Sequence, residues 1–180
     1  MPHPLPQVLL TMWNDTDTPI AFLITFRCYG TWLHGDERGS IDRHNNKYGS
    51  PKHPATPHWQ QISEDRLKQP PVKLDSFRRT VVERAIRNVC EKRGWHLHTT
   101  NIRTNHAHSV VANPGKSSGI VLNAFKANAT REMREAGCWL SDRSPWADKG
   151  SQLKLWTEKH LFDAVNYVLN GQGNNLPKFE

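Results

Sequence analysis

Asn105-His106-Ala107-His108-Ser109-Val110-Val111-Ala112 has the length and composition of a β-strand in the middle of a sheet. Side chains two residues apart on a strand point to the same face of the sheet. His106 and His108 are therefore expected to lie side by side, with Ala107 and Ser109 on the opposite face. Two neighbouring imidazoles can coordinate one metal ion. They can equally be half-buried strand residues that bind no metal, because two ligands do not define a site.

Further segments on both sides of this strand have the periodicity of strands or helices. In chain order they are a strand over 21–28, a helix between Asp75 and Gly94, strands over 95–103 and 106–112, a helix from 117 or 118, a loop over 139–150, a short strand over 152–157 and a helix over 158–170. This order predicts an α+β fold of the ferredoxin-like (split β-α-β) type, an antiparallel sheet with helices on one face and a further helix at the C-terminus. The other face of the sheet is expected to be open for a ligand.

The chain is basic: 24 Lys and Arg stand against 17 Asp and Glu, which gives a formal net charge of +7 and a pI near 9.5. Such an excess favours a polyanion such as a nucleic acid, and seven Trp, six Phe and three Tyr offer surfaces for base stacking. A basic protein without such a partner fits the composition equally well. Cys28, Cys90 and Cys138 show no paired spacing, which is typical of reduced cysteines. Because no segment has the length of a membrane span or the features of a secretion signal, we expect a cytoplasmic protein.

A length of 180 residues allows one domain with a sizeable core and hardly two. We assign residues 20–173 to this domain, residues 1–19 to an irregular lead-in and residues 174–180 to a tail. Residues 30–72 carry several prolines and are expected to form a long loop. A connector of this length is more often functional than not. We expect it either to contact nucleic acid or close over the site, or to be a solvated insertion.

Tyr167, on the last helix, is a second candidate for chemistry. At about 100° per residue, it falls roughly 140° from the centre of that helix's apolar side. The apolar side is formed by Leu161, Phe162, Ala164, Val165, Val168 and Leu169. Tyr167 is therefore expected to lie outside the core, either as a reactive phenol or as an ordinary surface tyrosine.

His96 and His98 form a second histidine pair on the preceding strand. If the strand register placed both pairs on one face, four histidines could form a zinc-type cluster. The sequence does not determine that register.

Three blocks of sequence carry a resemblance to a known family. They are Ile24-Thr25-Phe26-Arg27-Cys28-Tyr29-Gly30-Thr31-Trp32-Leu33-His34-Gly35-Asp36, Asn105-His106-Ala107-His108 and Tyr167-Val168-Leu169-Asn170-Gly171-Gln172. Together they resemble the single-tyrosine HUH transposases of small bacterial insertion sequences, and most closely the REP-associated tyrosine transposases. The resemblance extends from about residue 22 to residue 173. It implies the ferredoxin-like fold, with two histidines on a central strand and a nucleophilic tyrosine on a C-terminal helix.

Carried over by this resemblance, His106 and His108 match the family's metal ligands and Tyr167 matches its nucleophile. The third ligand in the family is usually a glutamine four residues after the tyrosine, where this chain has Gly171. We assign Gln172 to this role because a glycine can let the helix unwind, and Asp163 is the alternative. Mg²⁺ or Mn²⁺ is the expected ion, although imidazole ligands would also suit Zn²⁺.

The resemblance further implies a metal-dependent endonuclease and strand transferase that acts on single-stranded, hairpin-bearing DNA through a covalent 5′-phosphotyrosine intermediate. Such a protein would be bacterial and associated with the nucleoid when bound to DNA. It could be a monomer or a homodimer, with the tyrosine acting in cis or in trans. Candidate DNA contacts are Trp32, Arg38, Arg43, Lys47, Lys126, Arg131 and Arg134.

Two other interpretations stay open. The first is a hairpin-binding module of transposon origin that has lost catalysis. The second is an RNA-binding protein on the same sheet scaffold, whose bases would stack on aromatic residues of the sheet.

Overall fold

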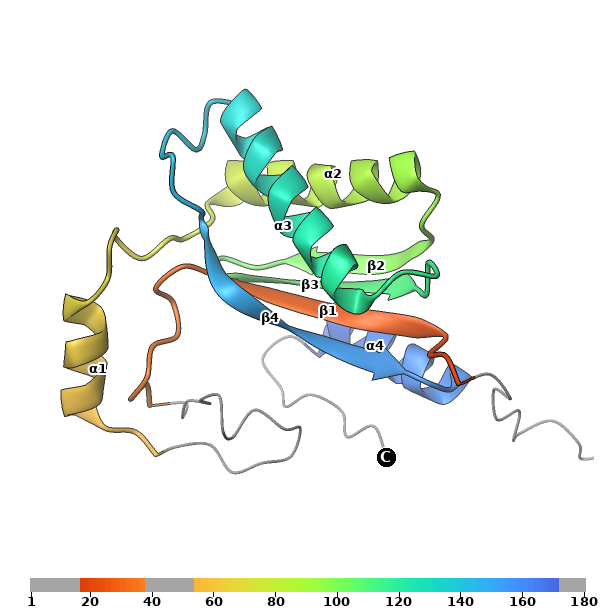
Figure 1. Ribbon diagram of the computed structural model, residues 1–180, viewed down its shortest axis with the longest axis horizontal. Coiled ribbons are helices and arrows are strands. Elements are labelled where there is room, and N and C mark those ends of the chain that lie inside the picture. Colours follow the sequence, from red (N-terminus) through yellow and green to blue (C-terminus); the bar gives the residue numbers. More distant parts are fainter. Residues whose placement is uncertain (1–16, 38–53, 172–180) are drawn as a thin grey trace, which may run out of the picture.

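The structure, a computed structural model, describes residues 17–37 and 54–171. The elements in these ranges are β1 (Ala21–Cys28), α1 (Pro57–Asp65), α2 (Ser76–Arg93), β2 (Leu97–Ile102), β3 (His106–Ala112), α3 (Ser118–Glu135), β4 (Trp146–Leu155) and α4 (Glu158–Asn170) (Figure 1). The strands form one antiparallel sheet in the order β2-β3-β1-β4. This is the α+β, ferredoxin-like arrangement that the sequence predicts, with the histidine strand β3 in the interior of the sheet.

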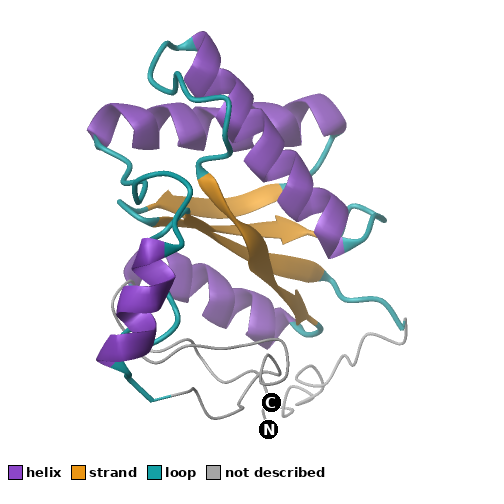
Figure 2. Cartoon of the chain, turned by 60° about the vertical axis from the view of Figure 1, so that its left-hand side comes forward, coloured by secondary structure: helices purple, strands orange, loops and turns teal. Residues whose placement is uncertain are grey.

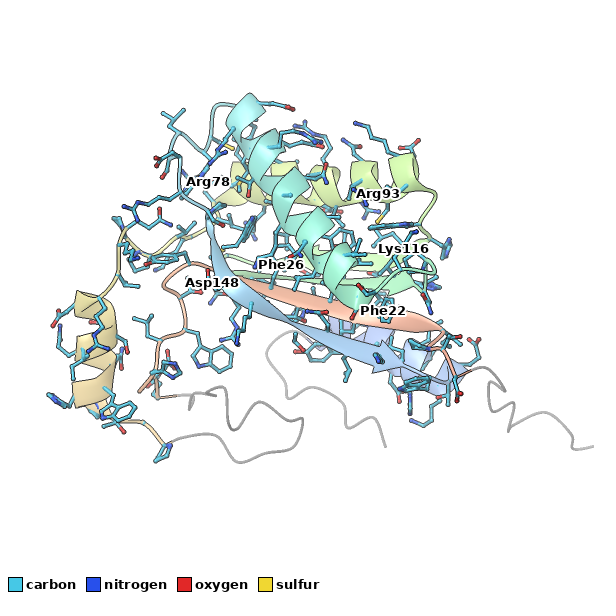
Figure 3. The ribbon with its side chains drawn as sticks, viewed as in Figure 1. Phe22, Phe26, Arg78, Arg93, Lys116 and Asp148 are labelled. Atoms are coloured by element: carbon cyan, nitrogen blue, oxygen red, sulfur yellow. The ribbon has the colours of Figure 1, made fainter. Side chains whose placement is uncertain are left out.

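One face of the sheet is covered by α2 and α3, as expected. Phe22 and Phe26 of β1 point into this layer (Figure 3) and are 3% and 0% exposed. Apolar side chains of both helices complete the larger of the two cores, among them Val82, Ile86 and Phe125. The alternation along β1 explains this layer, because every second residue from Phe22 faces the two helices.

The opposite face is covered in part by α4, whereas the sequence led us to expect an open face. Leu23 of β1 and Val110 of β3 pack there against Ala164 and Val168 of α4 in a second, smaller core. Figures 1 and 2 show the resulting order of layers, with α2 and α3 on one side of the sheet and α4 on the other. The expectation was wrong because Ala164 and Val168 give α4 an apolar stripe that needs a surface to cover.

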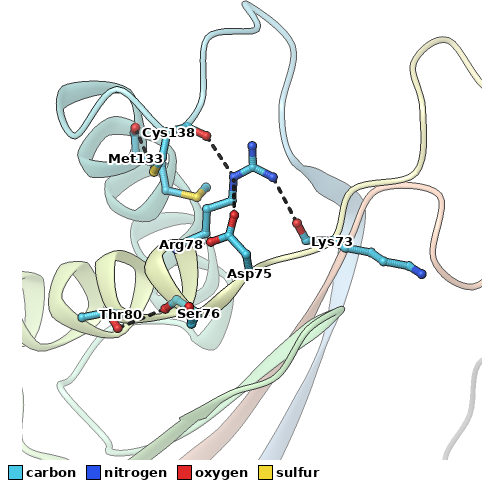
Figure 4. Close-up of polar contacts among 7 residues, drawn as sticks. All are labelled: Lys73, Asp75, Ser76, Arg78, Thr80, Met133 and Cys138. Atoms are coloured by element: carbon cyan, nitrogen blue, oxygen red, sulfur yellow. Dashed lines mark hydrogen bonds and ion pairs between the residues drawn. The ribbon is translucent and has the colours of Figure 1, made fainter.

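The ends of α2 follow the signals in the sequence. Asp75 is the N-cap, and its carboxylate accepts a hydrogen bond of 2.8 Å from the Arg78 N–H. Gly94 ends the helix in the left-handed conformation with φ of 65°. The Arg78 guanidinium then joins α2 to the segment after α3, because it donates to the Cys138 carbonyl at 2.9 Å and to the Lys73 carbonyl at 3.2 Å (Figure 4).

β4 begins earlier than the sequence pattern indicates. We expected a loop up to Gly150, but the strand starts at Trp146. The Trp146 ring packs edge-on against Phe26 with centroids 4.9 Å apart, and its indole N–H donates to the Thr130 hydroxyl at 2.9 Å. Trp146 is followed by Ala147 and then by the adjacent charged residues Asp148 and Lys149, so this half of the strand shows no alternating pattern in the sequence.

The interval between β1 and α2, which we expected to be irregular, contains α1. Pro57 stands in its first turn, where a missing N–H costs no hydrogen bond. No residue of α1 is buried, and the helix stands apart from the sheet (Figure 1). A helix without a buried face leaves no apolar periodicity in the sequence, which explains why the pattern missed it. Residues 38–53, together with 1–16 and 172–180, lie outside the described part of the chain.

In the part of the chain that the structure describes, no helix is both long enough and apolar enough to span a membrane.

Candidate functional site

His106 and His108 lie next to each other on β3, on the sheet face that α4 covers in part. Their ring centroids are 4.7 Å apart and the ring planes are inclined by 75°. Val110, two residues further along the strand, belongs to the core beneath α4, whereas Ala107 belongs to the core beneath α2 and α3. The alternation of the strand therefore brings the two imidazoles together as the sequence predicts.

Each imidazole has a polar partner at its Nδ1 atom. Thr25 Oγ1, on the neighbouring strand β1, lies 2.6 Å from His108 Nδ1. Asn105 Oδ1 lies 2.7 Å from His106 Nδ1. Histidines that bind metals commonly use one ring nitrogen for the metal and the other for a hydrogen bond that fixes the ring. The hydrogen bonds at Nδ1 of both rings fit this pattern, in which Nε2 would be the nitrogen that binds a metal ion.

His108 is only 5% exposed, and its surroundings oppose a positive charge. Burial, together with the smaller effects of the nearby His106 and Arg103, lowers the pKa of its imidazole from 6.5 to about 3. A neutral imidazole is the form that binds a metal ion, because protonation removes the lone pair. The site thus holds His108 in the form that a divalent ion requires.

The helix α4 places Tyr167 against this pair. The Tyr167 ring lies 5.5 Å from the His108 ring, with the planes inclined by 77°. Tyr167 is half-buried and packs against the smaller core, and burial raises the pKa of its phenol. The phenol is therefore protonated at neutral pH unless an activating group acts on it.

The position of Tyr167 on the helix differs from the one that we expected. Phe162 and Leu169, which we counted in the apolar side, are 71% and 57% exposed, whereas Ala164 and Val168 are fully buried. The side of α4 that faces the sheet is therefore closer to Tyr167 around the helix than the apolar side that we expected from the sequence. Three residues after Ala164, at about 100° per residue, Tyr167 lies only about 60° away from that residue around the helix. It borders the contact with the sheet instead of facing away from it.

Two contacts fix α4 at its ends. The Thr157 hydroxyl caps the helix by accepting a hydrogen bond of 3.1 Å from the His160 N–H. Near the other end, the Asn101 side chain of β2 donates to the Val168 carbonyl at 2.9 Å. The second contact lies one residue after Tyr167, so it holds the turn that carries the phenol.

Among residues 17–37 and 54–171, no group of three or more His, Cys, Asp or Glu side chains is placed to hold a metal ion. Gln172, our assigned ligand, lies outside the described residues. Asp163, the alternative, forms an ion pair with Lys159 at 2.6 Å. Both assignments stay predictions.

The four-histidine cluster does not form in this part of the chain. The rings of His96 and His98 are 4.6 Å apart, but the antiparallel register places them at the other end of the hairpin. Leu97 pairs with Val111, and His108 pairs with Asn101. The zinc-type interpretation is therefore wrong for the described residues.

The structure shows two arginines beside the candidate site that sequence reasoning missed. Arg27 of β1 is paired in register with His106, and its guanidinium stacks on the Trp32 ring at 4.1 Å. Arg103 follows β2 and its N–H donates to the His106 carbonyl at 2.8 Å. Arg27 therefore lies beside the pair in the sheet, and the charge of Arg103 lowers the pKa of His108, so both residues bring positive charge to the site, which suits a phosphate ligand. The alternation of β1 could have indicated Arg27, since Leu23, Thr25 and Arg27 share a face.

The basic residues that we selected on α3 lie on the side of the sheet opposite to the histidines. The Lys126 ammonium is half-buried and donates to the carbonyls of Ala147, Asp148 and Lys149 at 2.5, 3.0 and 3.3 Å, and burial lowers its pKa. Arg131 pairs with Glu135 at 3.6 Å, and Arg134 donates to the Asp142 carbonyl at 2.8 Å. These contacts hold α3 and its flanking loop. Arg38, Arg43 and Lys47 lie outside the described residues. The DNA contacts assigned to these three residues, to the three basic residues of α3 and to Trp32 remain predictions.

Comparisons with known proteins find only distant structural similarity. No protein-family model matches the chain, and no curated protein is significantly similar to it in sequence. Among solved structures, the chain is similar to a REP-associated tyrosine transposase bound to a REP hairpin, with 11% identity and a TM-score of 0.48. That match covers 84% of this chain and 65% of the other, so this chain spans less than two thirds of that protein. A candidate transposase from Deinococcus radiodurans R1 matches with 9% identity and a TM-score of 0.41, over 92% of this chain and 100% of the other. Identities and TM-scores this low carry no argument about function, which has to be argued from the residues of the site.

Proposed function

We propose that the protein is a metal-dependent endonuclease and strand transferase for single-stranded, hairpin-bearing DNA, with Tyr167 as its nucleophile. The observation that carries this proposal is the meeting of three side chains on one sheet face. The rings of His106 and His108 are 4.7 Å apart, and the Tyr167 ring is 5.5 Å from His108. Phosphoryl transfer of this kind needs both an ion site and a nucleophile, and these three side chains could supply them.

The reaction follows from the groups at the site. The Tyr167 oxygen would attack the phosphorus of a DNA phosphodiester and lose its proton as the new P–O bond forms. The bond from phosphorus to the 3′ oxygen breaks, and that oxygen takes up a proton and leaves as a 3′ hydroxyl. The 5′ phosphate stays on Tyr167, so the reverse attack by a 3′ hydroxyl can rejoin strands without ATP.

The protein side chains would share this work. A Mg²⁺ or Mn²⁺ ion held by His106 and His108 would polarise the phosphate and stabilise its developing charge. Arg27 and Arg103 bring positive charge to the site and would attract the DNA backbone. The packing of α4 on its own sheet supports action in cis, because Tyr167 meets His108 of the same chain.

The RNA-binding interpretation loses support from the same geometry. Bases would have to stack on the sheet face that carries the histidines. That face is covered in part by α4, whose Ala164 and Val168 are fully buried.

The test is a covalent-adduct assay with hairpin DNAs taken from the sequence that flanks the protein's own gene. Each strand is labelled at its 5′ or 3′ end and mixed with protein and Mn²⁺ or with a chelator. We expect a protein-linked band that needs Mn²⁺ and that carries only the 3′-end label, because the 5′ phosphate stays on the protein.

Variants identify the groups in that assay. Tyr167→Phe and His106→Ala should abolish the band. Tyr29→Phe is the matched control, because the Tyr29 hydroxyl accepts a hydrogen bond from the Lys68 N–H at 2.9 Å, outside the candidate site. An adduct that persists in Tyr167→Phe would refute the nucleophile assignment. Tight hairpin binding without any adduct would instead establish the non-catalytic binding module.

A further inference from the structure

A row of polar residues crosses the sheet at His108. The register pairs His108 of β3 with Asn101 of β2 on one side and with Thr25 of β1 on the other. Thr25 in turn pairs with Ser151 of β4. Within this row, Thr25 contacts the His108 ring itself, with its Oγ1 2.6 Å from Nδ1.

This contact has two forms that differ in the position of one proton. A neutral imidazole carries a proton on one ring nitrogen and a lone pair on the other. If His108 Nδ1–H donates to Thr25, the lone pair is on Nε2 and can bind a metal ion. If the Thr25 hydroxyl donates to Nδ1, the proton is on Nε2, and that nitrogen cannot be a ligand.

The neighbouring ring indicates which form applies. The partner of His106 Nδ1 is an amide oxygen of Asn105 at 2.7 Å, which can only accept a hydrogen bond. His106 therefore carries its proton on Nδ1. Because the rings lie 4.7 Å apart on one face, both can serve the same ion only if His108 adopts the same tautomer.

We propose that Thr25 is a positioning residue for the candidate metal site, accepting the Nδ1 proton of His108 and so presenting the Nε2 lone pair of that ring to the ion. This inference rests on the metal site of the function proposed above, because the tautomer is argued from one ion shared by both rings, but it does not depend on the role of that ion in strand cleavage. Thr25 also limits rotation of the His108 ring. Partners of this kind typically contribute 10- to 100-fold to metal affinity.

The experiment compares wild type, Thr25→Val and Thr25→Ser. Valine keeps the shape of threonine without the hydroxyl, and serine restores the hydroxyl. Thr100→Val is the matched control, because the Thr100 hydroxyl donates to the His108 carbonyl at 3.1 Å and does not contact the ring. Imidazole ¹⁵N chemical shifts of the metal-free proteins report the tautomer, and calorimetric titration with Mn²⁺ reports the affinity.

We expect His108 to carry its proton on Nδ1 in the wild type and in Thr25→Ser. Thr25→Val should populate the other tautomer and bind Mn²⁺ roughly 10-fold or more weakly, while Thr100→Val keeps both properties. A proton on Nε2 in the wild type overturns the proposal, and that measurement needs no variant. Wild-type Mn²⁺ affinity in folded Thr25→Val also overturns it. Neither readout involves DNA, so a missing adduct would refute the proposed function and leave this inference intact.

Discussion

The low pKa of His108 predicts that the metal-free protein loses stability in mild acid through this one residue. Its pKa is about 3 in the fold, against 6.5 for an ordinary histidine. Between these values the unfolded chain binds a proton that the folded chain does not, so stability falls as the pH drops below 6.5. Each pH unit in this window corresponds to about 1.4 kcal/mol. A change from pH 7 to pH 5 should therefore cost about 2 kcal/mol through His108, and nothing through this group above pH 7.

The assay is urea unfolding at pH 7 and pH 5 in the presence of a chelator, with His108→Gln as the variant. The variant removes the titrating group, so its free energy of unfolding should fall by about 2 kcal/mol less than that of the wild type. His58→Gln, a change at an exposed position of α1, is the control for replacing a histidine outside the candidate site. If wild type and His108→Gln lose the same stability to within about 0.5 kcal/mol, the burial of a neutral imidazole is refuted.

Three further substitutions test the fold around the site, and one mixing experiment tests whether the site acts in cis. Gly150→Ala would place a Cβ 2.6 Å from the Thr25 carbonyl oxygen and should lower the free energy of unfolding in urea by about 1–3 kcal/mol. Gly119→Ala, whose Cβ would meet nothing nearer than 3.6 Å, should instead stabilise α3 by about 0.5–1 kcal/mol. Equal effects of the two substitutions on stability would contradict the packing at Gly150. Asn101→Ala removes the hydrogen bond to the Val168 carbonyl of α4 and should lower the free energy of unfolding by about 1 kcal/mol. Amide hydrogen exchange in the last turn of α4 should become faster, and unchanged exchange would show that this hydrogen bond does not hold the helix. A mixture of Tyr167→Phe and His106→Ala proteins should form no adduct if the site acts in cis, and recovery of the adduct would show action in trans.

The sequence alone predicts the bounds of those elements whose residue patterns arise from burial or from helix capping. β1 and β3 have the expected bounds because alternate side chains enter two different cores. α2 begins after Asp75 and ends before Gly94 because a carboxylate caps one end and a left-handed glycine closes the other. These signals are local, so they can be recognised without knowing what packs against them.

The features that the sequence could not provide depend on contacts between distant residues. The length of β4 depends on Trp146 packing against Phe26, and the polar residues that follow conceal it. The orientation of α4 depends on which apolar residues meet the sheet. Phe162 and Leu169 are as apolar as the buried residues, and only the packing shows that they point outward.

The same distinction between local signals and contacts of distant residues applies to the candidate site. The alternation of one strand was enough to pair His106 with His108, because both lie on the same segment. Thr25 and Arg27 come from another strand, and only the register of β1 against β3 brings them to the histidines. Sequence pattern fixes the face of a residue but not its cross-strand neighbours.

The most direct test of the central proposal is the chemical identity of the protein–DNA adduct. After reaction with a hairpin DNA and Mn²⁺, nuclease and protease digestion followed by tandem mass spectrometry locates the nucleotide on the peptide. We predict a 5′-phosphonucleotide on the Tyr167 oxygen and on no other residue. A nucleotide on Tyr29, on Tyr48 or on a non-tyrosine side chain would contradict the account, as would the absence of any modified peptide under conditions in which the hairpin is bound.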